Sequence, residues 1–296
     1  MILEVRGGGL QLRMDSERGA RIVSIQGANG REWLAPSTDN EPTSWGDPFV
    51  RNGMGGWDEI VPSVAATRLA DGTCIPDHGD AWSVPWTIEA HSASVVTLAV
   101  QLTSMPIRLT RTVSATASGV RLSYRATTSS VRPIPFSWSA HPQFLAELTS
   151  VVSVAASNMT VRPALVREYP SPRGPLAFPS NAVLNELNEG RSLKAFVQES
   201  AVVDSATLTH PDGDALTLRW HAGSLPYLGL FWDRCEFAGR PVIAIEPTTA
   251  FGDDAGGAEA SGRIVRLSSS APLDWTLDLL CSLLPLVDPG GGSTKA

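Results

Sequence analysis

Short alternations of apolar and polar residues constrain the fold of this chain more than any other feature. They run through residues 94–104, 108–129, 214–223 and 242–247, and a period of two is typical of a β-strand with one buried face. Helical spacing is scarce, and only residues 180–190 favour a turn or two of helix. A parallel α/β fold needs helical connections between its strands. The sequence therefore predicts an all-β protein, a large antiparallel β-sandwich.

The chain is long enough to bury a substantial core. Its 296 residues are 43% hydrophobic, which suits one large β domain or two ordinary ones. Because no internal repeat or interdomain linker interrupts the pattern, we predict a single domain over residues 1–287. The glycine-rich end, residues 288–296, is expected to be a flexible tail.

The charge balance and the cysteines narrow the class of partner. A net charge of −7 and a pI near 5.3 argue against nucleic acid or an anionic membrane, since no Lys/Arg cluster offsets the repulsion. The N-terminus lacks a signal-peptide pattern, and no apolar run is long enough to span a bilayer. Cys74, Cys235 and Cys281 lie too far apart for a disulfide framework or a zinc motif. We expect a cytoplasmic protein with a small-molecule partner, and the oligomeric state stays open.

The chain has only five histidines, and their contexts differ. His91 and His210 have polar neighbours at strand or turn edges, which is typical of a solvated imidazole. His78 in "IPDHGDAWSVPW" and His141 in "SWSAHPQF" lie among tryptophans and turn residues, and such surroundings shift the pKa of an imidazole and fix its tautomer. For these two, a structural role and an acid–base role both stay open.

Three carboxylates are candidates for the partner of such a histidine. Glu246 follows the apolar run Val-Ile-Ala-Ile and precedes a proline. Burial there would raise its pKa and suit it to general-base work, whereas a solvated strand end is the alternative. Asp58 and Glu59 follow the glycine-rich turn in "GMGGWDEIVPS". Such turns bring backbone close to ligands, but they also simply connect strands.

Other catalytic motifs are missing from the sequence. There is no G-x-S-x-G nucleophile motif, and "RGGGLQL" lacks the Lys-Ser/Thr ending of a phosphate-binding loop. No HxH or HExxH spacing suggests a metal site. We therefore expect no metal and no cofactor.

Tryptophans lie beside the candidate residues and point to the class of ligand. The chain has nine of them, and we expect at least half to fill the core. Those near the candidates are Trp57, Trp82, Trp86, Trp138 and Trp232. Aromatic faces can stack on the C–H faces of a sugar ring while polar groups bind its hydroxyls, so the sequence favours a carbohydrate ligand.

Four motifs carry a resemblance to a known family. In order, "VRNGMGGWDE", "DHGDAW", "SAHPQF" and "IAIEPTTAFGDD" resemble the motifs of the aldose 1-epimerase (galactose mutarotase-like) superfamily, whose members are large antiparallel β-sandwiches. The resemblance spans residues 5 to 285. It implies that His141 is the general acid on the ring oxygen, that His78 lies near it, and that Glu246 is the general base on the anomeric hydroxyl.

The resemblance also implies residues that hold the sugar. The family uses an aspartate for the sugar hydroxyls, and Asp204 in "AVVDSATL" is our match for it. The full set of predicted substrate-binding residues is Arg51, Trp57, Asp58, Trp82, Asp204 and Trp232.

Two departures from the family pattern bear on the substrate. Gln143 replaces a common tyrosine, and Trp82 stands where members acting on hexose 6-phosphates tend to have arginine. Arg51 is then the only obvious cation in the matched segments, which is too little for a phosphate site. We predict an isomerase that interconverts the α and β anomers of a neutral monosaccharide. The alternatives are a non-catalytic carbohydrate-binding or regulatory protein on the same fold, a hexose-6-phosphate mutarotase, and an epimerase acting on an unusual sugar derivative.

Overall fold

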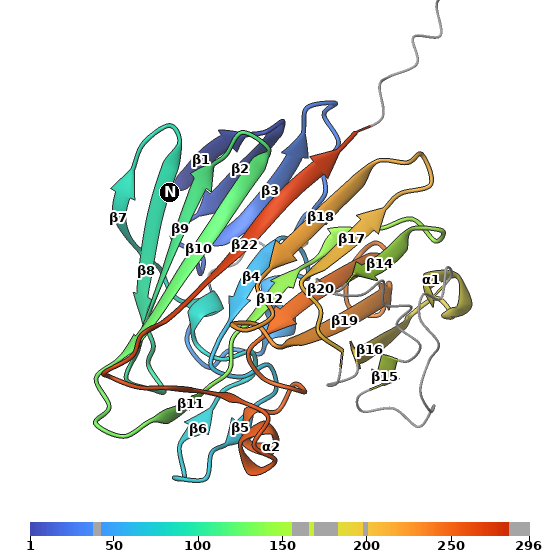
Figure 1. Cartoon of the computed structure of the whole chain (residues 1–296). Coiled ribbons are helices and arrows are strands. Elements are labelled where there is room, and N and C mark those ends of the chain that lie inside the picture. The colour runs from blue at the N-terminus through green and yellow to red at the C-terminus, as the bar shows by residue number, and fades with distance from the viewer. Residues whose placement is uncertain (38–42, 156–165, 169–182, 198–200, 284–296) are drawn as a thin grey trace, which may run out of the picture.

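Two large antiparallel sheets make up most of the molecule. A computed structural model of the chain describes residues 1–37, 43–155, 166–168, 183–197 and 201–283. Within these residues a ten-stranded and an eight-stranded sheet face each other, and two small sheets of two strands each lie at one end (Figure 1). The predicted all-β antiparallel sandwich is therefore confirmed.

The strands of the ten-stranded sheet, in spatial order, are β1 Ile2–Gly7, β2 Leu10–Asp15, β3 Arg21–Gly27, β4 Trp57–Ile60, β12 Ser139–Pro142, β20 Val242–Thr248, β19 Tyr227–Arg234, β16 Arg191–Val197 and β15 Val166–Glu168, with β13 Phe144–Leu145 also paired to β20. The eight-stranded sheet runs in the order β14 Val151–Ala155, β17 Ser205–Thr209, β18 Ala215–Trp220, β22 Leu273–Ser282, β10 Gly119–Thr128, β9 Ile107–Ala115, β8 Val95–Gln101 and β7 Thr87–His91. The small sheets and the short helices are β5 Thr67–Arg68, β6 Cys74–Ile75, β11 Ile134–Phe136, β21 Val265–Leu267, η1 Phe49–Asn52, η2 Ala81–Ser83, α1 Val183–Glu186 and α2 Ala255–Ala260.

The alternating segments of the sequence form strands as predicted. Residues 94–104 contain β8, residues 108–129 fall on β9 and β10, residues 214–223 contain β18, and residues 242–247 lie in β20. Along β10 the side chains of Val120, Leu122, Tyr124 and Ala126 are buried at every second position. Apolar burial of this kind fixes the register, because a slip by one residue would turn the apolar face to solvent. The predicted helical turn within residues 180–190 is α1.

β20 is buried on both of its faces. Ile243 and Ile245 belong to the main core between the two large sheets. Val242 belongs to a second, smaller apolar cluster that also contains Phe49, Met54 and Trp82. Since side chains alternate along a strand, Ala244 and Glu246 share the face of Val242. The ten-stranded sheet thus has a second covered face, away from the main core, and the candidate site lies there.

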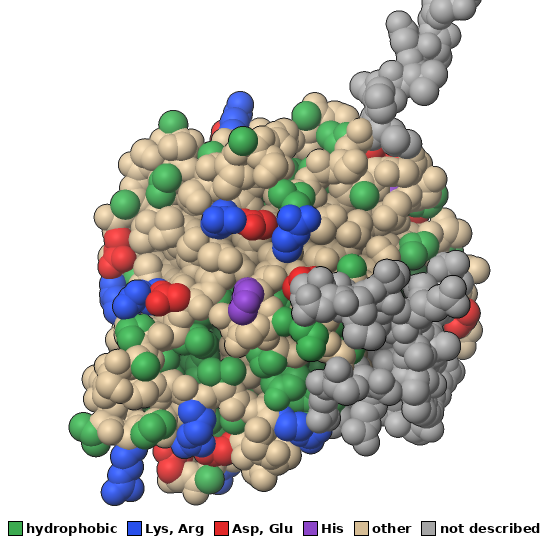
Figure 2. Space-filling model, in the orientation of Figure 1, with side chains coloured by type: hydrophobic (Ala, Val, Ile, Leu, Met, Phe, Trp, Pro, Cys, Tyr) green, Lys and Arg blue, Asp and Glu red, His purple; other side chains and the backbone are tan. Residues whose placement is uncertain are grey.

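Figure 2 shows charges of both signs scattered over the described part of one face of the molecule, without a continuous basic patch. The cross-strand ion pairs Arg121–Asp278 and Arg125–Asp274 on β10 and β22 are examples. No helix among the described residues is long and apolar enough to cross a membrane. The predicted flexible tail, residues 288–296, lies outside the described residues, and the single domain over residues 1–287 stays a prediction.

Candidate active site

Strand register brings a histidine and a glutamate together on the second covered face. β12 lies between β4 and β20, and its His141 is directly opposite Asp58 on β4. On the other side Ser139 is opposite Thr248, so two residues further along the antiparallel pair His141 comes opposite Glu246. Opposed side chains share a face and lie close together. The distance from His141 Nε2 to Glu246 Oε1 is 3.9 Å.

The second histidine reaches the same point from a loop. His78 and Gly79 both have left-handed backbone, with φ of 56° and 69°, which is uncommon for a residue other than glycine. A Cβ on Gly79 would lie 2.1 Å from the Val61 carbonyl oxygen, so the "HG" turn requires glycine there. This turn directs the His78 ring at His141, with the ring centroids 5.5 Å apart and nearly perpendicular.

Phe49 and Asp77 hold the His78 ring. Phe49 stacks on it at 4.0 Å between centroids and meets His141 edge-on at 5.2 Å. Asp77 Oδ1 lies 2.9 Å from His78 Nδ1. Although burial opposes the shift, the hydrogen bond and charge of His78 hold the pKa of the Asp77 carboxyl below its usual range. Because Nδ1 is engaged, Nε2 of His78 is the nitrogen left for the site.

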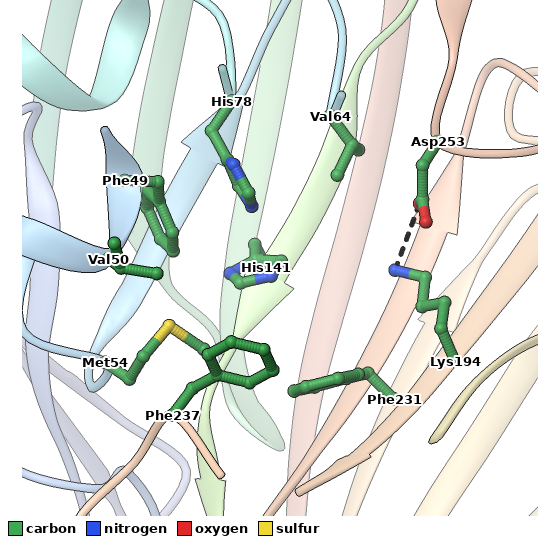
Figure 3. Close-up of a pocket in the computed structure, with 10 residues that line it drawn as sticks. All are labelled: Phe49, Val50, Met54, Val64, His78, His141, Lys194, Phe231, Phe237 and Asp253. Carbon is green, nitrogen blue, oxygen red and sulfur yellow. Dashed lines mark ion pairs between the residues drawn. The ribbon is translucent and has the colours of Figure 1, made fainter. Parts of the chain in front are cut away.

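Lys194 binds the other side of the glutamate. On β16 it lies opposite Phe231, which lies opposite Ala244, so Lys194 shares the face of Glu246. Its ammonium donates to Glu246 Oε2 and is 3.3 Å from Asp253 Oδ1 (Figure 3). Glu246 therefore has one oxygen held by a cation, while Oε1 is buried and accepts no hydrogen bond from the described residues.

Burial shifts the pKa values of this cluster. Burial raises the pKa of the Glu246 carboxyl above its ordinary value, although the Lys194 ammonium opposes the shift. Burial alone would lower the pKa of Lys194, but the carboxylates of Asp253 and Glu246 raise it. Lys194 is therefore protonated near neutrality. Glu246 contacts the cavity through its neighbours His141 and Lys194 and is not itself a lining residue. A carboxylate with a raised pKa and an oxygen that accepts no hydrogen bond is a stronger base than a solvated one.

The surroundings of His141 favour its neutral form. Burial, together with the positive charges of His78, Lys194 and Arg21, lowers the pKa of His141 well below its usual value. The Gln143 amide nitrogen lies 3.1 Å from His141 Nδ1. The same nitrogen is 3.4 Å from Nε2, so the shorter contact favours Nδ1 as the acceptor of the amide N–H and the tautomer that carries its proton on Nε2.

A cavity of about 180 Å³ opens beside these groups. It is lined by Phe49, Val50, Met54, Val64, His78, His141, Lys194, Phe231, Phe237 and Asp253 (Figure 3). The cavity is smaller than the roughly 300–1,000 Å³ typical of drug-sized ligands, so it suits one small molecule. Among the described residues, no group of three or more His, Cys, Asp or Glu is placed to hold a metal ion.

The predicted tryptophans do not line the cavity. Trp232 adjoins the cavity residue Phe231 on β19, but alternation turns it to the main core, where it lies opposite Ile243. Trp57 likewise adjoins Asp58 and is fully buried in the main core. Trp82 lies in the smaller cluster, edge-on to Phe49 at 5.2 Å. The phenyl rings of Phe49, Phe231 and Phe237 line the cavity instead.

Three other predicted substrate-binding residues are also placed away from the cavity lining or not described. Asp58 is buried and forms a bidentate ion pair with Arg21 behind His141. Asp204 precedes β17 in the eight-stranded sheet, and its backbone carbonyl accepts from Trp220. Arg51 belongs to η1, but its side chain lies outside the described part of the structure.

The expectation of a solvated imidazole is wrong for His210. The ring is buried, with Nδ1 3.0 Å from Ser150 Oγ and with Trp33 stacked on it at 5.1 Å. Burial also lowers the pKa of His210. Polar neighbours in the sequence gave no sign of the tryptophan that covers the ring from the other end of the chain.

Sequence reasoning missed Lys194 and Asp253. The signal for the lysine was its rarity, because Lys194 and Lys295 are the only two lysines among 23 basic residues. It also alternates with apolar residues in "RSLKAFV", a buried strand where a lysine needs a partner. Asp253 lies within the fourth quoted motif, but that motif alone could not single it out.

Comparison with solved structures shows which known proteins share this fold. No family model matches the sequence, and no curated protein matches it. A galactose mutarotase-like protein from Lactobacillus casei superposes with a TM-score of 0.68 at 19% identity, over 95% of this chain and 100% of that one. A galactose mutarotase related enzyme from Lactobacillus acidophilus gives 0.68 at 13% identity, over 96% and 98%. The Slr1438 protein from Synechocystis sp. PCC 6803 gives 0.72 at 13% identity, over 95% and 96%. The chain has the antiparallel β-sandwich fold of galactose mutarotase-like proteins.

Proposed function

We propose that this protein is an isomerase of the aldose 1-epimerase type, which interconverts the α and β anomers of a neutral monosaccharide. The observation that carries the proposal is the pair formed by Glu246 and His141. Their facing atoms are 3.9 Å apart beside a cavity for one small molecule, and Glu246 Oε1 has no hydrogen-bond donor among the described residues. The names of the structural neighbours, galactose mutarotase-like and galactose mutarotase related, support the same reaction.

The reaction needs one base and one acid. Glu246 takes the proton from the C1 hydroxyl, and the electrons of that O–H bond form the C1 carbonyl. The bond between C1 and the ring oxygen breaks, and the ring oxygen takes a proton from His141. Rotation about C1–C2 presents the other carbonyl face, and ring closure with the roles reversed gives the other anomer. No atom is gained or lost, so the two side chains suffice.

The neighbours of the pair prepare it for this chemistry. Lys194 holds Oε2 of Glu246 and so leaves Oε1 for the anomeric hydroxyl. The shorter Gln143 contact, to Nδ1, favours the tautomer with the His141 proton on Nε2, the nitrogen 3.9 Å from Glu246 Oε1. His78 lies at the edge of His141, where its Nε2 can bind a hydroxyl of the sugar.

The charge at the cavity supports a neutral substrate. The ammonium of Lys194 is already shared between Glu246 and Asp253, so a phosphate would meet two carboxylates beside one cation. The Arg234 guanidinium donates to the Leu187 carbonyl, so this contact engages it outside the cavity lining. The three cysteines are free, as expected for a protein in a reducing compartment. We propose a cytoplasmic location and a small-molecule sugar as the partner.

An anomerisation assay tests the proposal. Pure α-anomers of a panel of monosaccharides are dissolved, and the approach to equilibrium is followed by polarimetry or NMR with and without the protein. We expect at least one neutral sugar to equilibrate faster. The His141→Asn variant, which keeps a polar side chain but no acid, is the control and should lose the acceleration. Sugar binding without acceleration of any anomer would show a binding protein in place of an enzyme.

A further inference from the structure

The cavity has two chemically unlike sides. Lys194 and Asp253 lie with Val64 and Phe231 on one side of His141, while Val50, Met54 and Phe237 form the other (Figure 3). We call the latter three residues the apolar wall. Met54 continues into the smaller apolar cluster beneath, so this side is built on packed hydrophobic side chains. The charged side can bind hydroxyls, whereas the apolar wall offers them no side-chain partner.

The acid and the base together orient the sugar, and this step rests on the proposed function. His141 serves the ring oxygen and Glu246 serves the hydroxyl on C1. Because Glu246 is bound to Lys194, C1 lies toward the charged side. The ring oxygen is bonded to C1 on one side and to C5 on the other. C5 and its substituent therefore point away from Lys194, toward the apolar wall.

We propose that the apolar wall receives the C5 substituent and that the preferred substrate is a 6-deoxyaldose, with a methyl group at C5. In an ordinary hexose this substituent is a hydroxymethyl group, whose hydroxyl loses water on binding. A methyl group loses nothing there and covers apolar surface. An apolar pocket rejects an added hydroxyl by up to about 10²-fold.

The exposure of the apolar wall sets the size of the expected preference. Met54 is 7% exposed, but Val50 and Phe237 are 56% and 47% exposed. Water can therefore still reach part of a hydroxyl at this rim. We expect the preference for the 6-deoxy sugar to be about tenfold, at the low end of the range for an apolar pocket.

Pairs of sugars that differ only at O6 test the inference. The pairs are 6-deoxy-D-galactose with D-galactose, 6-deoxy-D-glucose with D-glucose, and 6-deoxy-L-mannose with L-mannose. We expect kcat/KM to be about tenfold higher for the 6-deoxy member of each accelerated pair. An equal or higher value for the parent hexose overturns the apolar-wall assignment and leaves the proposed function standing.

If no sugar is anomerised faster, the proposed function fails. Calorimetric Kd values for the same pairs then test separately whether the apolar wall receives the C5 substituent. Tighter binding of the 6-deoxy member supports it, and equal or weaker binding overturns it.

Variants of the apolar wall give a second test. Met54→Gln keeps the side-chain length but adds an amide that can bind O6, so the preference should fall to less than about threefold. Met54→Leu is the matched control and should keep the preference. Since Phe237 is half-exposed, Phe237→Gln makes the same test without disturbing the core. A tenfold preference that persists in both glutamine variants contradicts the inference.

Discussion

Two buried glutamates of this protein differ in how their oxygens are occupied. Glu59 on β4 and Glu246 on β20 are both 0% exposed. Burial raises the pKa of each carboxyl, and a buried cation opposes the shift in each case, Arg111 for Glu59 and Lys194 for Glu246. Judged by burial and pKa alone, the two carboxylates would be equal candidates for a catalytic base.

Their hydrogen bonds separate them. Glu59 Oε1 accepts from Arg111 and from the Tyr124 hydroxyl, each at 2.8 Å, and Oε2 accepts from Trp138 Nε1 at 2.8 Å. Glu246 has Lys194 on one oxygen and no donor on the other among the described residues. A satisfied buried carboxylate stabilises a fold, whereas an unsatisfied one is retained at a cost that a ligand can offset.

The two faces of the sheet account for the difference. Asp58 lies opposite His141, so the next residue, Glu59, points to the opposite face. There it meets Arg111 on β9 and Tyr124 on β10, and thus ties the two sheets together across the main core. Glu246 faces the cavity side. The side of the sheet on which each glutamate lies therefore accounts for the different occupancy of its oxygens.

The largest expected effect is on stability, in Glu59→Gln. This change leaves the Arg111 charge buried without its counter-ion, and such a loss costs about 3–5 kcal/mol. We expect the free energy of unfolding, measured by urea titration with tryptophan fluorescence, to fall by about that amount. A loss below about 1 kcal/mol would show that Glu59 is not the structural member of the pair.

Glu246→Gln should give the opposite pattern. The amide cannot take the anomeric proton, so anomerisation should fall by about 10² or more, or roughly 2.7 kcal/mol in the barrier. Stability should change by less than about 1 kcal/mol, because Asp253 stays beside the Lys194 ammonium at 3.3 Å. The same polarimetric assay and urea titration measure both quantities. Turnover close to that of the wild type would remove Glu246 from the mechanism.

Charge gives the next contrast between the two sites. The Glu59–Arg111 pair is neutral, whereas Glu246, Asp253 and ionised Lys194 sum to one negative charge when both carboxylates are ionised. A neutral monosaccharide should therefore be turned over with a kcat/KM at least about tenfold above that of its 6-phosphate, or about 1.4 kcal/mol. A tenfold preference for the phosphate would mean that a cation site exists outside the described lining residues.

Much of this arrangement could be predicted from the sequence, for physical reasons. A period of two and frequent turn residues define strands, so the β-sandwich followed from the pattern. His78, His141 and Glu246 were chosen by their unusual contexts, and the structure brings them together. Their catalytic roles stay predictions.

The side of the sheet to which each of two adjacent apolar residues points could not be predicted. Phe231 and Trp232 are adjacent, both are apolar, and nothing local says which one faces the main core. Lys194 meets Glu246 across 52 positions in the chain through the pairing of β16, β19 and β20. Such a contact depends on the order of strands within the sheet, which the alternating pattern does not contain.

The smallest expected effect concerns the pH dependence of the base, and two variants should move it in opposite directions. Anomerisation needs Glu246 ionised, so kcat/KM is lost as the pH falls through the pKa of this carboxyl in the free enzyme. That pKa is raised above 4.5 in the wild type by burial and, secondarily, by Asp253, while Lys194 lowers it. The acid limb of the wild-type profile should therefore lie above pH 4.5.

Lys194→Met removes the lowering charge, so the acid limb should move to higher pH. Asp253→Asn is the matched control. It removes a raising charge, so the same limb should move to lower pH. If Lys194 only supported the fold, its replacement would change the free energy of unfolding without displacing the acid limb. The pH profiles of both variants would then coincide with that of the wild type. Shifts of the same sign in the two variants would contradict the assignment of Lys194 as the residue that positions and ionises Glu246.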